Sequence, residues 1–314
     1  MDDGLNAPSF DTQLAQGQVN FTALLNRIKA EFPKLGFVEA RLNDLGEDHA
    51  VVILDDGWVF RFPRTSEYAA RGEGERRLLK RLRDQISVPV PNYDLVSATG
   101  DFAGYPMIHG VQLTETVFTT APQSVQEELL RELGGFLSGL HALPASLLSG
   151  TDHLRPRLWR GSDYARRYHE RRARFANITG HIPISRVDAF FAAFPEIVDV
   201  EPNALIHDDL TSDHILLAQN GRGLGGVIDF SDAGYGDAAR DFAFFWTYGV
   251  WAPDIVADAY SEMEDRARLL LRSRWWFLRF SIERLWWHFE TTRASCDVVK
   301  VRGDILQTLD ALGL

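Results

Sequence analysis

The sequence contains a single cysteine and no long uncharged hydrophobic run. Cys296 cannot form a disulfide within the chain, and a zinc site with several cysteines is excluded, so we expect a reducing compartment. The N-terminus has two acidic residues where a secretory signal would carry positive charge, and no apolar segment follows them. The most apolar stretches, 241–251 and 275–289, are too short or too often interrupted by charge to span a bilayer. These absences predict a cytoplasmic protein with no membrane partner.

Positive charge is also scarce. The 314 residues contain 33 Lys and Arg against 44 Asp and Glu, which gives a formal net charge of −11 at pH 7. Negative charge repels nucleic acid and attracts cations, so we expect no nucleic-acid partner. With 45% hydrophobic residues, the chain is long enough to form one or two domains around a sizeable core. We expect a monomer.

The first hundred residues predict a helix followed by a small antiparallel sheet with one packed helix. Helical spacing over 21–32 is closed by a proline and a glycine, and a second, charged helical pattern covers 71–84. An Asp-Asp-Gly turn at 55–57 lies between two apolar runs and indicates a hairpin. The runs with strand character are 37–42, 50–54, 58–62, 93–97 and 102–108.

Beyond Gly110 the pattern is mainly helical. Helices are predicted at 122–143, 162–175, 185–194, 254–274 and 275–292, and short strands near 204–206, 215–218 and 226–230. A β-rich front joined to a helical back is an α+β two-lobe plan. We place an N-terminal nucleotide-binding lobe at 1–108, a C-terminal catalytic and acceptor-binding lobe at 109–314, and a hinge at 106–110.

Polar side chains gather in two loops of the second lobe. Residues 206–217 read IHDDLTSDHILL, which sets Asp209 and His214 among apolar residues, and 227–230 read VIDF, which sets Asp229 after a strand. Oxygen and nitrogen ligands from two strand ends suit phosphoryl transfer, where Mg²⁺ is held against phosphates and a hydroxyl is aimed at the γ-phosphorus. Asp209 would accept the hydroxyl proton, and Asp229 would hold the metal.

These two blocks resemble those of the aminoglycoside phosphotransferase family, which are small-molecule kinases with a protein-kinase-like fold. The shared pattern is H-x-D-x-x-x-x-[N/H]-[I/V]-L followed by I-D-[F/W]. A histidine at 214, where most members have asparagine, makes the chain most similar to aminoglycoside 2″-phosphotransferases and macrolide phosphotransferases. Other similar segments follow in order along most of the chain, at 45–48, 60–63, 75, 90–91, 140–141, 236–237 and 241–242.

The resemblance implies a bilobal fold, ATP or GTP as the phosphate donor, and Mg²⁺ as the cofactor. It implies that Asp209 is the catalytic aspartate, that His214 and Asp229 are the metal ligands, and that His207 braces the loop. The implied nucleotide contacts are Gly46 and Asp48 in the loop over the nucleotide, Arg61, Glu75 in the helix behind it, and the hinge residues Met107, Ile108 and His109.

Two of these assignments have rivals nearby. Arg61 stands where kinases commonly place a lysine, and its guanidinium can grip phosphate oxygens or a carboxylate; if it points outward, Arg64 is the next candidate. Glu73 competes with Glu75, which we prefer because it directly precedes an apolar ridge that should anchor the helix on the sheet. The loop at 45–48 has one glycine, and the absence of a Walker A motif disfavours a P-loop kinase.

The acceptor site is predicted from charge and from one helix. Arg279, Glu283, Trp287 and Glu290 share a stripe at spacings of four, four and three, and Asp232 is a further acidic candidate. Acids beside a tryptophan could receive a cationic sugar through charge-assisted hydrogen bonds and stacking. An amphipathic helix with core tryptophans and solvated charges explains the stripe equally well.

The predicted function is Mg²⁺-dependent transfer of the γ-phosphate of ATP or GTP to a hydroxyl of an aminoglycoside. Two alternatives stay open. The acceptor could be a macrolide or another hydroxylated metabolite, for which Phe244, Phe245, Trp246, Trp275 and Trp276 could line an apolar pocket. The chain could also be a catalytically silent kinase-like module, which the departures at 61 and 214 favour and the aspartates at 209 and 229 oppose.

Overall fold

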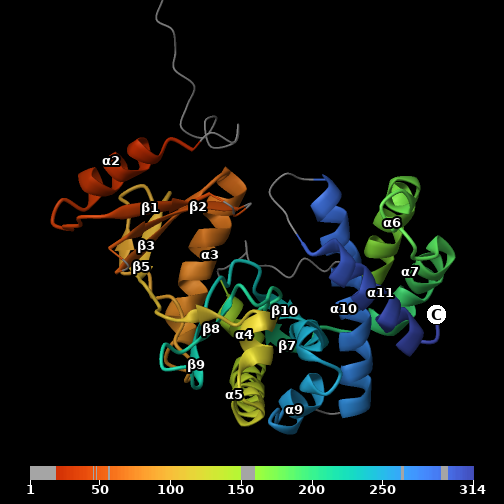
Figure 1. Cartoon of the computed structure of the whole chain (residues 1–314). Helices are drawn as coiled ribbons and strands as arrows, with labels where there is room; N and C mark the ends of the chain where they lie inside the picture. The colour runs from red at the N-terminus through yellow and green to blue at the C-terminus, as the bar shows by residue number, and fades with distance from the viewer. Residues whose placement is uncertain are drawn as a thin grey trace, which may run out of the picture.

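The N-terminal part of the chain forms an antiparallel sheet of five strands in the order β1-β2-β3-β5-β4 (Figure 1). The computed structural model describes residues 19–44, 46, 48–55, 57–149, 160–262, 265–290 and 296–314. The expected loop residues Leu45 and Glu47 and the turn residue Asp56 lie outside these. The strands are β1 Ala40–Asn43, β2 His49–Leu54, β3 Trp58–Pro63, β4 Leu95–Val96 and β5 Ala103–Pro106.

Strand β3 presents different side chains to the two faces of this sheet. Side chains alternate along a strand, so Phe60 and Phe62 share one face and Arg61 takes the other. The two phenylalanines pack with Leu24 and Ile28 of helix α2 (Phe21–Glu31) in a small hydrophobic cluster. Arg61 is left to face helix α3 (Ser66–Leu82) and the rest of the molecule.

Helix α3 begins at Ser66, five residues before the predicted start. Thr65 caps it, because its hydroxyl accepts the N–H of Tyr68 at 3.3 Å. Its apolar ridge, Leu78, Leu79 and Leu82, packs into the large hydrophobic cluster that fills the C-terminal lobe. The helix thereby connects the sheet to that lobe.

The C-terminal lobe is mainly helical, so the predicted α+β architecture is confirmed. Its helices are α4 Glu115–Thr120, α5 Gln123–His141, α6 Gly161–Ala176, α7 Ile184–Val198, α8 Ala239–Phe242, α9 Ala252–Asp258, α10 Arg266–Glu290 and α11 Val298–Ala311, with 3-10 turns η1 Ala145–Leu148 and η3 Ala243–Tyr248. Its strands are β6 Val111–Gln112, β7 Ala204–Ile206, β8 Ile215–Leu217, β9 Leu224–Val227 and β10 Gly234–Gly236, paired as β6-β8-β9 and β10-β7.

The predicted boundary between helices 254–274 and 275–292 is wrong. Helix α9 ends at Asp258, and helix α10 then runs without interruption from Arg266 to Glu290. A change from charged to aromatic composition at 274–275 is no helix stop, since neither glycine nor proline occurs within α10. Helices α4 and α11 were missed, although Asp297 caps α11 and apolar residues recur along it.

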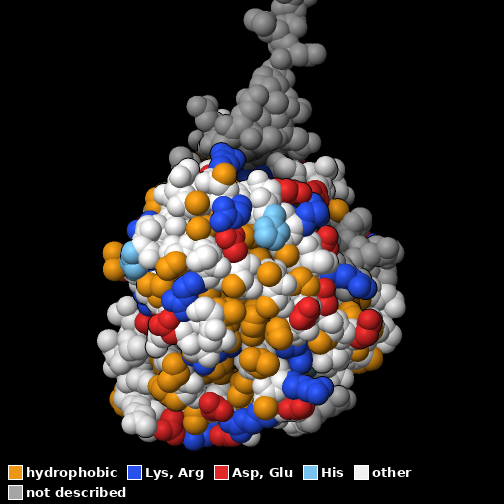
Figure 2. Space-filling model, turned by 90° about the vertical axis from the view of Figure 1, so that its right-hand side faces the viewer, with side chains coloured by type: hydrophobic (Ala, Val, Ile, Leu, Met, Phe, Trp, Pro, Cys, Tyr) orange, Lys and Arg blue, Asp and Glu red, His pale blue; other side chains and the backbone are white. Residues whose placement is uncertain are grey.

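The face that carries α6, α7 and α11 shows hydrophobic side chains gathered in its middle, with basic and acidic side chains interspersed around them (Figure 2). Among the residues that the structure describes, no helix is long and apolar enough to cross a membrane.

Candidate active site

The pairing of β8 with β9 brings Asp209, His214 and Asp229 together. The strands are antiparallel with Ile215 opposite Val227, so the residue before β8 and the residues after β9 lie at the same end. Nδ1 of His214 lies 3.4 Å from Oδ2 of Asp209, and its Nε2 lies 3.7 Å from Oδ2 of Asp229. One imidazole ring therefore has a carboxylate on each side.

A buried network holds the loop between β7 and β8. Asp241 accepts the N–H groups of His207 and Asp208 at 2.8 and 2.9 Å, and it also contacts Nε2 of His141 at 3.1 Å. Nε2 of His207 donates to the carbonyl of Ile228 at 3.0 Å, which ties the loop to the segment after β9. The brace expected from His207 is thus present, and Asp241 fixes a backbone that is left-handed at Asp208, with φ +65°.

Arg61 connects the sheet, α3 and the loop after β9. Its Nη1 donates to both carboxylate oxygens of Glu75 at 3.1 Å, and its Nη2 donates to Oδ1 of Asp229 at 2.9 Å. Nη2 also lies 3.1 Å from Nδ1 of His49, which must accept because a guanidinium only donates. Glu75 is fully buried and further accepts the N–H of Phe230.

The rival residues Arg64 and Glu73 lie elsewhere. Arg64 donates through Nε to the carbonyl of Gly46 at 3.0 Å and pairs with Asp44, so it braces the loop before β2. Glu73 is exposed and pairs with Arg77 on α3.

Sequence reasoning missed His49 as a partner of Arg61. The hairpin register places Val51 opposite Arg61, and His49 lies two residues away on the same face. The strand register that follows from the turn at 55–57 would therefore have predicted that His49 and Arg61 lie close together.

The surroundings of the loop shift the pKa values of Asp209 and Asp229 in opposite directions. Burial opposes ionisation of Asp229, but the charges of Arg61 and His214 prevail and hold its pKa below the usual range. Partial burial, with Asp232, Asp229 and Asp208 nearby, raises the pKa of Asp209, although His214 opposes the rise. Asp229 is consequently the stronger anion, and Asp209 is the better placed to take up a proton.

Asp229 and His214 are the side chains that could hold Mg²⁺ here, Asp229 through the oxygen ligand that the ion prefers and His214 through a ring nitrogen. Nδ1 of His214 lies 2.7 Å from the carbonyl oxygen of Asp209 and donates to it, so loss of the other ring proton would turn the Nε2 lone pair towards Asp229. Within the described ranges, no group of three or more His, Cys, Asp or Glu side chains forms a metal cluster. Two protein ligands suffice for Mg²⁺ at phosphates, because the ion keeps several waters and takes phosphate oxygens as further ligands.

The predicted nucleotide contacts belong to the loop before β2 and to the segment after β5. Gly46 and Asp48 belong to the loop that Arg64 braces, since the carbonyl of Asp48 also accepts the N–H of Arg64. At the hinge, the N–H of Met107 donates to the carbonyl of Gly57 at 3.0 Å. The N–H groups of Ile108 and His109 form no hydrogen bond with any residue that the structure describes, so main-chain donors remain available for a ligand.

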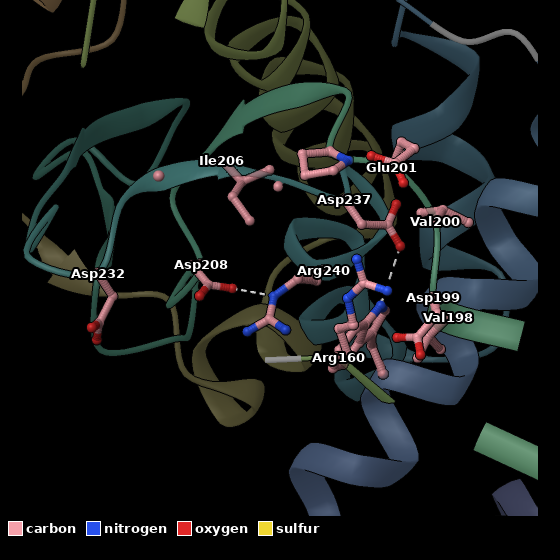
Figure 3. A pocket seen from close by; sticks show the side chains of 14 residues that line it. Arg160, Val198, Asp199, Val200, Glu201, Ile206, Asp208, Asp232, Asp237 and Arg240 are labelled. Atoms are coloured by element: carbon pink, nitrogen blue, oxygen red, sulfur yellow. Dashed lines mark hydrogen bonds and ion pairs between the residues drawn. The ribbon is translucent and has the colours of Figure 1, made fainter. Parts of the chain in front are cut away.

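A pocket with a cavity volume of about 120 Å³ opens beside the loop (Figure 3). Asp208 and Asp232 lie at one end of it, the 198–201 segment lies at the other, and Arg240 stands between them in Figure 3. The charged side chains that line it are Asp199, Glu201, Asp208, Asp232, Asp237, Arg160 and Arg240.

Some of these charges are already paired. Arg240 forms an ion pair with Asp208 and lies 4.2 Å from the ring centroid of Trp276. Asp237 pairs with Arg272 at 3.0 Å. Acids remain in excess over bases in the pocket.

The predicted acceptor residues are divided between different places. Asp232 lines this pocket, where Nη1 of Arg71 approaches it to 3.4 Å. Glu283 lines a second hollow, between α6, α7 and α10, and pairs with Arg279. Glu290 pairs with Arg174 at 3.2 Å. Trp287 lines neither the pocket nor the second hollow. Asp208 and Arg240 were not singled out from the sequence, because their contact joins a loop to a helix 32 residues away.

Solved structures of antibiotic phosphotransferases share this fold. The GDP and kanamycin complex of APH(2″)-IIIa matches with a TM-score of 0.73 at 20% identity, over 93% of this chain and 97% of that one. Macrolide 2′-phosphotransferase MphH from Brachybacterium faecium matches with a TM-score of 0.62 at 22% identity, over 90% and 97% of the two chains. At these identities the likeness establishes the kinase-like fold.

Sequence comparison gives the family. The uncharacterized protein YcbJ of Bacillus subtilis (strain 168) is 28% identical over 232 residues, which are 66% of this chain and 70% of that protein. The model of the phosphotransferase enzyme family, APH, matches residues 39–276, well over half of the chain. The resemblance seen in the motifs is therefore confirmed, and the chain belongs to the phosphotransferase enzyme family.

Proposed function

We propose that this chain transfers the γ-phosphate of ATP or GTP to a hydroxyl of a cationic small molecule, namely an aminoglycoside. The observation that carries the proposal is the acidic pocket lined by Asp208, the residue before Asp209. Within the described part of the chain, Asp199 and Glu201 form no ion pair, so their charge is available to ammonium groups of an acceptor. Of the described residues that line the pocket, only Trp276 would offer an aromatic side chain to a large apolar acceptor.

The chemistry follows from the placement of the carboxylates. The acceptor oxygen forms a bond to the γ-phosphorus, the bond from that phosphorus to the β,γ-bridging oxygen breaks, and the hydroxyl proton passes to Asp209. Asp229 and His214 would hold Mg²⁺, which neutralises charge on the phosphates when it is bound. Arg61 orients Asp229 and neutralises the buried Glu75. Catalysis is mainly positioning and electrostatic stabilisation.

An acceptor panel tests the proposal. Nucleoside diphosphate release is measured with ATP and with GTP in the presence of kanamycin, gentamicin or erythromycin, and mass spectrometry identifies the phosphorylated product. We expect turnover with an aminoglycoside. Turnover with erythromycin alone would contradict the aminoglycoside proposal and favour a macrolide acceptor. If none of the acceptors gave turnover, the proposal would have no support.

A matched pair of variants tests the role of the pocket. Glu201→Gln removes a lining carboxylate and should raise the KM for the aminoglycoside about tenfold, the value of one charge-assisted hydrogen bond. Glu196→Gln removes the same charge from an exposed position on α7 outside the pocket and should leave the KM unchanged. Equal effects of both variants would indicate only long-range attraction.

A further inference from the structure

Arg240 is a charged residue of the acidic pocket to which the chemistry above gives no role. It belongs to helix α8, directly before Asp241, and it stands between Asp208 and the 198–201 segment (Figure 3). Acids are in excess among the residues that line this pocket, and Arg240 brings positive charge into it. Attraction of a cationic acceptor therefore does not account for an arginine at this place.

The guanidinium of Arg240 is held by two different contacts. Its Nε donates to Oδ1 of Asp208, and its plane lies 4.2 Å from the ring centroid of Trp276. The side chains of Arg240 and Asp208 are only 11% and 20% exposed. Trp276 is itself buried, and its indole N–H donates to Asp237 at 3.2 Å. A largely buried pair on a fixed ring keeps one geometry, whereas an exposed ion pair separates easily.

Asp208, the partner of Arg240, has an unusual backbone conformation. Its φ of +65° lies in the left-handed region, which residues with a Cβ rarely adopt, although aspartate tolerates it better than most. Asp241 accepts the N–H of Asp208 at 2.9 Å, and Arg240 binds its side chain. Two neighbouring residues of α8 thus hold the backbone and the side chain of the same residue.

The conformation of Asp208 determines where the next side chain, that of Asp209, points. The backbone torsions at one residue orient the Cα–Cβ bond of the residue that follows. A return of Asp208 to negative φ would therefore rotate the Asp209 carboxylate away from its place 3.4 Å from Nδ1 of His214. Without Arg240, the carboxylate of Asp208 would lie among other acids with no cation beside it, and turning towards water would favour this rotation.

We propose that Arg240 is a positioning residue for phosphoryl transfer, which acts through Asp208 and maintains the left-handed turn that aims Asp209. The proposal rests on the catalytic role proposed for Asp209. Misplacement of a reacting group by about 1 Å is enough to cost about 100-fold in rate. Direct contact between Arg240 and the acceptor is the rival explanation, and it predicts a rise in the acceptor KM instead of a fall in kcat.

Glycine at position 208 separates the two explanations, because glycine adopts positive φ without any contact to its side chain. We measure kcat and the acceptor KM of Arg240→Met, Asp208→Gly and the double variant, with the acceptor found in the panel. Arg240→Met should lower kcat about 10–100-fold and leave the KM within about threefold of the parent. Asp208→Gly should keep kcat within about threefold, and adding Arg240→Met to it should lower kcat no further.

Hydrogen–deuterium exchange on the full chain gives a readout that needs no turnover. The N–H groups of His207 and Asp208 are both bonded to Asp241, so their exchange reports whether the loop opens. We expect exchange at least about tenfold faster in Arg240→Met, and exchange at the parent rate in the double variant. If no acceptor gives turnover, the proposed function fails, and the exchange rates still decide whether Arg240 holds the loop.

Arg274 supplies the matched control. Its guanidinium also lies over a tryptophan, at 4.6 Å from the ring centroid of Trp246, but it does not line the pocket. Arg274→Met makes the same substitution and should leave kcat and loop exchange unchanged. Arg240→Lys keeps the charge and should give an intermediate kcat, which maintains the test if Arg240→Met fails to fold.

Four results would overturn the proposal. These are a parent-like kcat in a folded Arg240→Met protein, an equal loss of kcat on adding Arg240→Met to the parent and to Asp208→Gly, loop exchange in Arg240→Met at the parent rate, and equal effects of Arg240→Met and Arg274→Met.

Discussion

At the scale of single residues, the site depends on how Arg61 divides its hydrogen-bond donors. One nitrogen serves Glu75, and the other serves His49 and Asp229. Because Glu75 is fully buried, its charge is tolerable only beside a cation. The same guanidinium also orients the Asp229 carboxylate. Arg61 therefore contributes both to the stability of the fold and to the geometry of the site.

Removing that cation should strongly destabilise the fold. Arg61→Met leaves Glu75 buried without its partner, and the free energy of unfolding should fall by about 3–5 kcal/mol. Arg77→Met removes an exposed arginine from α3, where it pairs with exposed Glu73, and should cost less than about 1 kcal/mol. Urea denaturation of both variants measures the difference. Similar losses in the two variants would contradict the role given to Arg61.

His49 should make stability depend on pH. Burial first, and then the charge of Arg61, lower the pKa of His49 well below the usual value, so the folded chain holds it neutral. The unfolded chain takes up a proton below about pH 6.5, which favours unfolding there. Relative to His49→Gln, the parent should lose up to about 1.4 kcal/mol of stability for each pH unit below 6.5. Parallel stability curves of parent and variant between pH 5 and 7.5 would exclude this effect.

At the scale of elements, close approach of two helices determines which positions accept a side chain. Helix α5 contains adjacent glycines, and Gly134 faces α9 while Gly135 faces outward. A Cβ on Gly134 would lie 2.4 Å from the carbonyl oxygen of Val256 and 2.8 Å from Cβ of Ala259, whereas a Cβ on Gly135 would meet nothing within 4 Å.

The two glycines should respond to alanine with opposite signs. Gly134→Ala forces α5 and α9 apart and should destabilise the protein by about 1–3 kcal/mol, the usual cost of overpacking. Gly135→Ala should stabilise it by about 0.5–1 kcal/mol, because alanine is the better helix former. Thermal unfolding of both variants gives the comparison. Stabilisation by Gly134→Ala would show that the helices are not in close contact.

Elements also show where sequence reasoning succeeded and where it failed. The hairpin β2–β3 was predicted because a short turn and alternating runs are local signals. The break between α9 and α10 was misplaced because it is stabilised by a distant contact, in which the hydroxyl of Ser138 on α5 accepts the N–H of Ser261. Local composition carries no information about that contact.

At the scale of the whole molecule, there are two hydrophobic clusters, one between α2 and the sheet and one that joins α3 to the C-terminal helices. The spacing of Asp209, His214 and Asp229 was enough to predict their convergence, because it depends on strands that are neighbours in sequence. The acidic pocket and the second hollow were beyond reach, since they combine residues from α6, α7, α10 and the 198–208 segment. The predicted stripe at 279–290 lies on one helix, yet its two acids form separate ion pairs, Glu283 with Arg279 and Glu290 with Arg174.

The most direct test of the central claim compares two aspartates of one loop. Asp209→Asn removes the proposed proton acceptor, and Asp213→Asn makes the same charge change at an exposed position four residues on. Phosphate transfer from ATP or GTP to the acceptor found in the panel is measured for both, with nucleotide affinity and thermal stability as controls. We expect kcat to fall about 10²–10⁴-fold in Asp209→Asn and to stay within a factor of about two in Asp213→Asn. A folded, nucleotide-binding Asp209→Asn protein with the kcat of the parent would contradict the assignment of this loop as the catalytic centre.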